Sequence, residues 1–394
     1  MNGLSTVFAR KRYLLLLLSI VLVCFNLRPA ITAVAPLLGE MEHDLGLSLD
    51  SSGGFALLPV FVLGIAAPFA PRIARYMAPC KIIFWFLLLS IVGILWRSYG
   101  GIIGLFGGMT VVGFGLGIAG ASIPGFIKHE FPLKASLMMG IYSALVGLGS
   151  ATAAAVTVPV AHLLGGWRGG LSFWIIPILI AVAVWGFYFF RHPEPSQLQA
   201  LNTRMSQLFV RARAWQITLF YMSRVAGAYF FFIWIPILLR QRGMSVEDAG
   251  FALSLATISQ IPATLAANWL AEKTGDQGQL IIMAFMGAAC ACWGILYASL
   301  EWVIPLGIIY GLGTGLVFSR GMALMVERAE SATVAIELSG MAQGVGFTVG
   351  ALLAFFGSFF LPQEGAFLPF CLLYTLFCVM GIVFGKLSAR PGYV

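Results

Sequence analysis

Apolar runs long enough to cross a bilayer, each of roughly 20 residues, recur along the whole chain. The 394 residues are 60% hydrophobic and only 10% charged, which leaves too few ionisable groups to cover the surface of a soluble fold. We therefore expect a membrane protein with many spans. The predicted spans lie near residues 13–38, 53–73, 80–97, 100–127, 135–164, 169–190, 214–239, 248–271, 279–298, 302–326, 332–360 and 366–386.

These spans are expected to be helices, because lipid offers no hydrogen-bond partner to an open strand edge. Strands of a β-barrel would alternate polar and apolar residues, whereas the run from Tyr13 to Cys24 is apolar on every side. Three basic residues, 10–12, precede this run as in a signal peptide, but no convincing small-residue cleavage site follows. The predicted fold class is therefore an all-α integral membrane protein with twelve transmembrane helices, the first of them retained.

Basic residues are distributed unevenly between the two sides of this topology. With the N-terminus in the cytoplasm, 16 of the 23 Lys and Arg residues fall on the cytoplasmic side. Those on the opposite side are Arg97, Arg168, Arg240 and Arg242, and those within spans are Arg28, Arg224 and Arg320. The positive-inside rule then predicts a multi-pass protein of the bacterial inner membrane with both termini in the cytoplasm. The net charge of +8 follows from this orientation and does not indicate nucleic-acid binding.

The chain reads as two similar halves. The longest polar interruption predicts a linker over residues 191–213, between six-helix bundles at 1–190 and 214–394. Sequence matches between the halves recur at offsets of 196, 198 and 200 residues, and their first members are Gly54-Phe55-Ala56-Leu57, Gly113-x-Gly115-x-Gly117 and Pro36. Their counterparts are Gly250-Phe251-Ala252-Leu253, Gly311-x-Gly313-x-Gly315 and Pro236. Repeated halves with a site between them are the usual construction of secondary transporters.

Several segments, spread over essentially the whole chain, resemble the cyanate and nitroimidazole transporter branch of the major facilitator superfamily. The segments are Asn26-Leu27-Arg28-Pro29, Ala33-Val34-Ala35-Pro36-Leu37-Leu38, Pro124-Gly125-Phe126-Ile127-Lys128, Gly166-Trp167-Arg168, Trp215-Gln216-Ile217-Thr218 and Leu338-Ser339-Gly340-Met341-Ala342-Gln343. The resemblance implies two pseudo-symmetric six-helix bundles. It also implies that the first and seventh spans line a central cavity from opposite halves.

Two arginines lie near the middle third of the membrane. Arg28 is about 15 residues into the first span and Arg224 about 10 residues into the seventh, or about 22 Å and 15 Å along a helix axis. Measured from Pro36 and Pro236, their positions differ by about one helical turn, so they occupy equivalent faces of the repeat-related helices. An ionisable group at this depth needs a partner or water. We predict a two-sided clamp for an anion, since a guanidinium group can bind a carboxylate or phosphate bidentately. The alternative is that both arginines are structural.

Two further charges, Arg320 and Glu337, lie at equal depth near the cytoplasmic ends of consecutive spans. This placement favours an ion pair with a structural or gating role. Arg320 as part of the substrate site and Glu337 as a proton-coupling carboxylate remain alternatives. Uncharged groups could complete the substrate site. The candidates are Asn26, Tyr142, Tyr221, Tyr229, Gln260 and Gln343.

The predicted function is alternating-access transport of a small organic anion, carboxylate-like or cyanate-like, coupled to protons or to an exchanged anion. A carrier of a neutral or drug-like molecule is the alternative, and a passive channel is a further class. No catalytic constellation is evident, so no enzyme activity is expected. The six cysteines contain no CxxC pair, so neither a metal site nor a cofactor is expected. The partners are then the substrate and the lipid bilayer.

Overall fold

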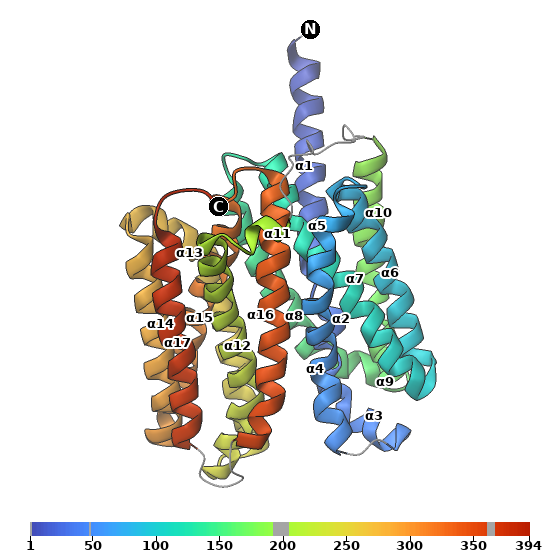
Figure 1. Ribbon diagram of the computed structural model, residues 1–394. Helices are drawn as coiled ribbons and strands as arrows, with labels where there is room; N and C mark the ends of the chain where they lie inside the picture. Colours follow the sequence, from blue (N-terminus) through green and yellow to red (C-terminus); the bar gives the residue numbers. More distant parts are fainter. Residues whose placement is uncertain (1, 47–48, 192–204, 361–366) are drawn as a thin grey trace.

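The computed structural model describes residues 2–46, 49–191, 205–360 and 367–394, and every regular element within these ranges is a helix (Figure 1). The first half contains α1 (Asn2–Asn26), α2 (Pro29–Thr32), the 3-10 turn η1 (Ala35–Leu37), α3 (Leu38–Leu45), α4 (Leu49–Ala66), η2 (Ala67–Phe69), α5 (Ala70–Ile73), α6 (Pro79–Tyr99), α7 (Gly101–Glu130), α8 (Ala135–Leu163), α9 (Trp167–Ser172) and α10 (Ile175–Arg191). The second half contains α11 (Met205–Leu208), α12 (Ala212–Gln241), α13 (Val246–Thr274), α14 (Gln277–Tyr297), η3 (Leu300–Trp302), α15 (Val303–Glu327), α16 (Ala332–Phe360) and α17 (Phe367–Ala389).

The described helices account for the predicted spans. Eleven are long and apolar enough to cross a membrane, and a shorter apolar helix covers Leu57–Ile73, where the second span is expected. Prolines explain why two spans are broken into pieces. Pro29 has no N–H to donate, so α1 ends at Asn26 and α2 begins at Pro29. The second span changes to 3-10 geometry at η2, which contains Pro68, before it continues as α5.

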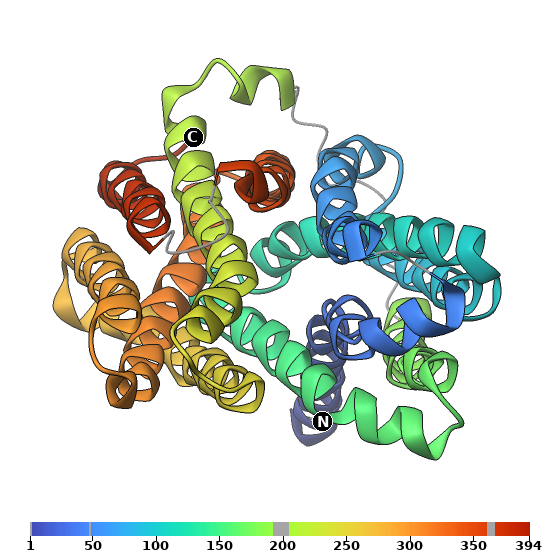
Figure 2. The same cartoon turned by 90° about the horizontal axis from the view of Figure 1, so that it is seen from below.

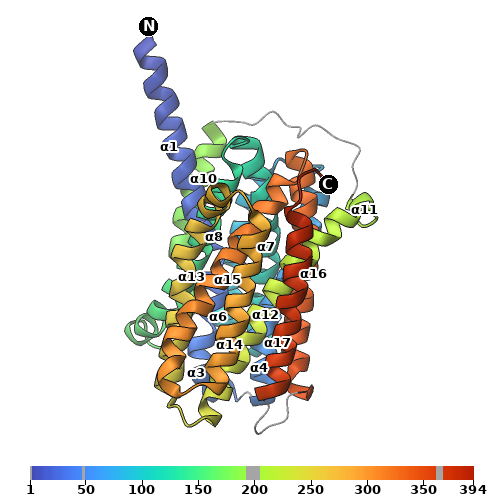
Figure 3. The same cartoon turned by 90° about the vertical axis from the view of Figure 1, so that its left-hand side faces the viewer.

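The helices form two bundles that lie side by side (Figures 1 and 2). One consists of α1 to α10 and the other of α12 to α17. One large apolar cluster lies within the second bundle, and another extends from the first bundle to α12, α15 and α16 of the second. Most of the predicted linker, residues 192–204, lies outside the described residues. Both ends of the chain lie at the same end of the molecule, beyond which α1 projects (Figure 3). We call this the termini end; α3 and α9 lie at the opposite end.

The two glycine motifs make corresponding contacts in the two bundles. Gly117 on α7 lies against Ala66 of α4, and Gly315 on α15 lies against Gln260 of α13. A Cβ on Gly315 would be 2.5 Å from the Gln260 carbonyl oxygen, so only glycine permits this approach of the two backbones. The middle glycine, 115 or 313, turns instead toward α6 or α14. The repeat visible in the sequence is therefore a repeat of helix packing.

Contacts between the bundles concentrate toward the termini end. Helix α16 packs against α4, η2, α5 and α7, and α8 packs against α13 and α15. Gly340, near the start of α16, lies against Ala67 and Pro71. On the other pair of helices, Asn268 of α13 donates its amide to the Ser136 carbonyl oxygen of α8 at 2.6 Å. The ends of the helices that meet here all lie near the termini end, so the bundles are closed together on that side.

Candidate functional site

Arg28 lies at the break in the first span, where it is the residue before α2. Its backbone leaves helical geometry there (φ −122°, ψ −33°), so its half-buried side chain is not aligned with those of α1. The guanidinium donates from Nη1 to the Tyr229 hydroxyl of α12 at 2.9 Å, across the two bundles. Its central carbon also lies 4.9 Å from the centre of the Phe347 ring of α16. Arg28 is thus held by groups of the opposite bundle.

Arg224 extends from the middle of α12, in the second bundle. Its Nη2 donates to Gln260 Oε1 of α13 at 3.3 Å, and its central carbon lies 4.2 Å from the centre of the Phe318 ring. Its Nε atom is buried and has no hydrogen-bond partner in the part of the chain that the structure describes. The Gln260 that binds Arg224 is the same residue whose backbone packs on Gly315, so the glycine motif of α15 helps to position the site.

The two arginines lie near each other. They are close enough for their charges to act on each other, and Tyr221 and Tyr229 of α12 are close to both. Tyr142 of α8 is buried next to Arg28 and Tyr221. Neither arginine forms an ion pair with a carboxylate within residues 2–46, 49–191, 205–360 and 367–394. The two cations are therefore neutralised by no protein anion that the structure describes.

Two of the predicted site residues bind elsewhere through their amides. Asn26 is fully buried and its amide donates to the Pro177 carbonyl oxygen of α10 at 3.1 Å, so it belongs to packing within its own bundle. Gln343 is buried on α16 and donates to the Ser339 hydroxyl at 2.7 Å, one turn away, but it lies one turn before Phe347, which contacts Arg28. Tyr142, Tyr221 and Gln260 do lie around the arginines, together with Tyr229.

The expected ion pair between Arg320 and Glu337 is wrong. Arg320 binds Glu327 in a bidentate pair, with Nη1–Oε1 at 3.0 Å and Nη2–Oε2 at 2.9 Å. Seven residues are close to two helical turns, so both side chains lie on one face of α15. That spacing is visible in the sequence. Glu337 is also buried, and its Oε2 has no partner among the described residues.

Arg320 belongs to a polar network that joins the bundles. The network is completed by Asn268 Oδ1 at 2.7 Å and Gln277 Oε1 at 2.9 Å, which both accept from Arg320. Ser136 of α8 donates its hydroxyl to Glu327 Oε1 at 2.7 Å. Arg320 is only 1% exposed and lies toward the termini end of α15, in contacts that close the bundles together. Arg320 thus takes part in contacts between the bundles.

Arg97, expected at the end of the third span on the side opposite the termini, is completely buried within α6. Its Nη1 donates to the Ala30 carbonyl oxygen of α2, next to the break, and lies 3.3 Å from the Met109 sulfur. No carboxylate pairs with it in the described ranges. A predicted span that ended at residue 97 could not reveal this burial, because the helix continues to Tyr99.

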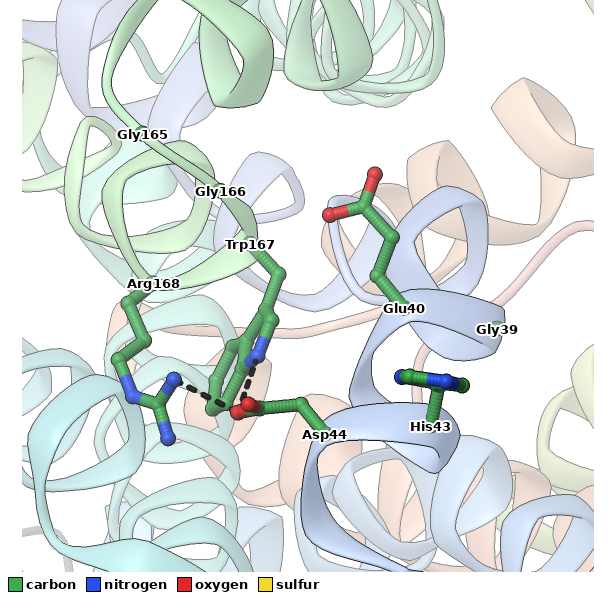
Figure 4. A pocket seen from close by; sticks show the side chains of 8 residues that line it. All are labelled: Gly39, Glu40, His43, Asp44, Gly165, Gly166, Trp167 and Arg168. Carbon is green, nitrogen blue, oxygen red and sulfur yellow. Dashed lines mark hydrogen bonds and ion pairs between the residues drawn. The ribbon is translucent and has the colours of Figure 1, made fainter.

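A separate pocket of about 520 Å³ lies at the opposite end, between α3 and the segment before α9 (Figure 4). Asp44 accepts from Trp167 Nε1 at 3.0 Å and from Arg168 Nη1 at 2.7 Å, while the carboxylate of Glu40 points away from them. The Gly166-Trp167-Arg168 segment thus fixes α3 to the bundle. Since the pocket's arginine is already paired, the pocket is a poorer anion site than the region between the bundles.

A model of the Major Facilitator Superfamily matches residues 16–358. The chain belongs to this superfamily. Among known proteins it is 28% identical over 382 residues to an uncharacterized transporter of Bacillus subtilis (strain 168), covering 96% of this chain and 94% of the relative. It is 30% identical to the 2-nitroimidazole transporter of Escherichia coli (strain K12), with 88% of each chain covered. The cyanate transport protein of the same organism is 26% identical, with 95% and 97% covered.

The fold of this major facilitator superfamily member is similar to that of a solved proton:xylose symporter. The TM-score is 0.74 at 10% sequence identity, and 93% of each chain is covered. These comparisons confirm the predicted family branch and the all-helical fold of two bundles. They also agree with the expectation that the chain is a transporter and not an enzyme.

Proposed function

We propose that this superfamily member carries a small organic anion across the bacterial inner membrane by alternating access, with both termini in the cytoplasm. The observation that carries the proposal is the pair Arg28 and Arg224. Two guanidinium groups from opposite bundles approach one region and have no carboxylate partner among the described residues. An anionic substrate bound between them would supply the missing negative charge.

Electrostatics supports an anion as the missing partner. Taking a cation out of water costs several kcal/mol unless it is paired. The protein offers each arginine one neutral oxygen and one aromatic face, which stabilise a cation only partly. An N–H group that binds no described residue, at Arg224 Nε, remains for a carboxylate or a cyanate-like ion. The remaining uncharged groups around them, Tyr142, Tyr221 and Gln260, can bind the rest of the substrate.

The inter-bundle contacts support the transport cycle. Because the bundles touch toward the termini end, the structure fits a state closed to the cytoplasm, given the proposed orientation. Rocking of the bundles about the site would separate α16 from α5 and α8 from α13, and would open the cytoplasmic side. The two sets of contacts that must break are the small-residue seam at Gly340 and the network around Arg320.

Substrate charge determines the driving force. Each net negative charge gains about 2.3 kcal/mol per 100 mV on leaving a cell that is negative inside. Export of an anion could therefore run on the membrane potential alone. Import needs a compensating positive charge or an exchanged anion, so we propose that protons or a counter-anion accompany the substrate.

The test uses purified protein in liposomes. Wild-type protein should be stabilised against heat by small carboxylates or cyanate and should catalyse their counterflow. Arg28→Gln and Arg224→Gln should each abolish both effects, whereas Arg240→Gln, at an exposed position of α12, should leave them unchanged. Saturable transport of an anion that survives both substitutions would contradict the clamp.

A second candidate is a carrier of a neutral or drug-like molecule. It is favoured by the relative named as a 2-nitroimidazole transporter and by the rings of Phe318 and Phe347 at the site. In that case the same liposomes would transport a neutral nitroimidazole, and its transport would tolerate Arg28→Gln. Competition between the neutral compound and carboxylates would indicate one site for both.

A further inference from the structure

Glu337 is a buried acid that the proposed anion site does not use. It lies in the second turn of α16, which begins at Ala332, and only 1% of it is exposed. Its Oε2 atom is enclosed and accepts no hydrogen bond from any residue that the structure describes. This oxygen therefore has neither water nor a donor to stabilise a negative charge.

Glu337 lies at the seam where α16 of the second bundle packs against the first bundle. The preceding residue, Ile336, packs in an apolar cluster with Ala67 and Ala70 of the first bundle, and Gly340 lies one turn further along against Pro71. The seam around the acid is therefore apolar and closely packed. When the bundles separate at this end, α16 moves away from η2 and α5, and water can reach the carboxyl group.

Few charges compensate the acid. Those that act on it are Arg75, just after α5, and Arg211, at the start of α12, and both are exposed. Neither is within ion-pair distance in the described structure. Among the described residues, no basic group forms an ion pair with it. Arg320, the expected partner, is bound to Glu327.

We propose that Glu337 is a proton-binding site whose occupancy is tied to closure of the bundles at the termini end. The closed seam encloses the neutral carboxylic acid, and opening hydrates the group so that it releases its proton to that side of the membrane. This inference rests on the alternating-access motion proposed above and is independent of the anion site.

The sign of the effect follows from linkage. Since the closed state binds the proton more tightly than the open state, lowering the pH stabilises the closed state. For one proton, the ratio of closed to open molecules changes by at most about tenfold per pH unit, and the gain is lost as the pH rises.

The experiment measures the opening directly, without substrate. Spin labels replace Leu133 and Thr274 in a variant whose six native cysteines are changed to alanine. Both positions are exposed at the termini end, Leu133 in the first bundle and Thr274 in the second. Pulsed dipolar spectroscopy in liposomes between pH 5 and 9 gives the closed fraction. We expect this fraction to fall with rising pH in the parent protein and in Glu337→Asp. Glu337→Gln, a neutral isostere, should remain closed at every pH.

Glu330→Gln is the matched control, because it removes one exposed acid at the same end, and it should titrate like the parent. A closed fraction that does not change with pH in the parent, or that changes equally in Glu337→Gln, would overturn the proposal. If Glu337→Gln does not fold, infrared spectra of the parent decide. A protonated carboxyl band that is present in the closed state and unaffected by Glu330→Gln supports the site, and its absence refutes it. Neither result for Glu337 affects the anion clamp, which is tested separately by Arg28→Gln and Arg224→Gln.

Discussion

At the scale of single residues, the two central arginines differ in how they are held. Arg28 depends on a hydroxyl and a ring from the opposite bundle, whereas Arg224 is bound within its own bundle by Gln260 and Phe318. The Tyr229 hydroxyl is therefore a contact that rocking of the bundles would alter. We therefore expect the contacts of Arg28 to change both with substrate binding and with movement of the bundles, while Arg224 keeps a fixed position in its bundle.

Removing that hydroxyl tests its role. In Tyr229→Phe, Arg28 loses an acceptor, and a hydrogen bond to a charged group contributes about 1.5–3 kcal/mol. We expect the apparent KM of anion counterflow to rise about tenfold with little change in the amount of folded protein. Tyr297→Phe, at an exposed ring of α14, is the control and should match wild type. An unchanged KM in Tyr229→Phe would exclude this tyrosine from positioning Arg28.

At the scale of helices, glycines determine how closely neighbouring spans pack. The outer glycines of each motif hold α7 on α4 and α15 on α13, and the middle glycine holds the third helix of each set. On α15 this contact also positions the helix segment that carries Gln260. Packing and the substrate site are therefore linked through one pair of helices.

Gly315→Ala should separate α15 from α13. The added methyl group would overlap the Gln260 backbone, and overpacking of this kind costs about 1–3 kcal/mol. We expect a lower unfolding temperature in detergent and weaker stabilisation by anions. Gly287→Ala on α14, where nothing lies within 4 Å of the added atom, should be as stable as wild type or slightly more so. Equal unfolding temperatures for Gly315→Ala and wild type would contradict the packing argument.

The sequence was sufficient for the helices and for their repeated packing, because long apolar runs and regularly spaced glycines are local signals. It placed Arg28 and Arg224 at membrane depth for the same reason. It did not reveal the burial of Arg97, since a helix end can be wrong by several residues, nor the rings of Phe318 and Phe347, which are two among 32 phenylalanines. It also led to the wrong prediction that Arg320 pairs with Glu337. Equal depth in the membrane does not determine which face of a helix a side chain occupies.

At the scale of the whole molecule, closure at the termini end depends on two different kinds of contact. The seam at Gly340 is apolar, whereas the side formed by α8, α13 and α15 is polar and centres on Arg320. Removal of Glu327 from the second contact would leave a buried arginine without its anion, a loss that costs about 3–5 kcal/mol in proteins. The two sides can therefore be weakened separately.

Glu327→Gln should shift the molecule toward opening at the termini end. The substitution removes the charge that pairs with Arg320, and we expect the ratio of closed to open molecules to fall more than tenfold at neutral pH. The same label pair, Leu133 and Thr274, measures it, with Glu330→Gln as the control. A closed fraction equal to that of the control would show that the network does not hold the bundles together.

The burial of Arg97 has a consequence for biogenesis. An arginine at the centre of a nascent span costs about 2.5–3.5 kcal/mol during insertion by the translocon, and the cost is smaller for Arg97, which lies two residues from the end of α6. Its main acceptor, the Ala30 carbonyl, belongs to a segment synthesised 67 residues earlier. That acceptor is therefore synthesised before α6, and it lies next to the break in the first span. The interruption at Arg28 thus also provides the third span with an acceptor for its arginine.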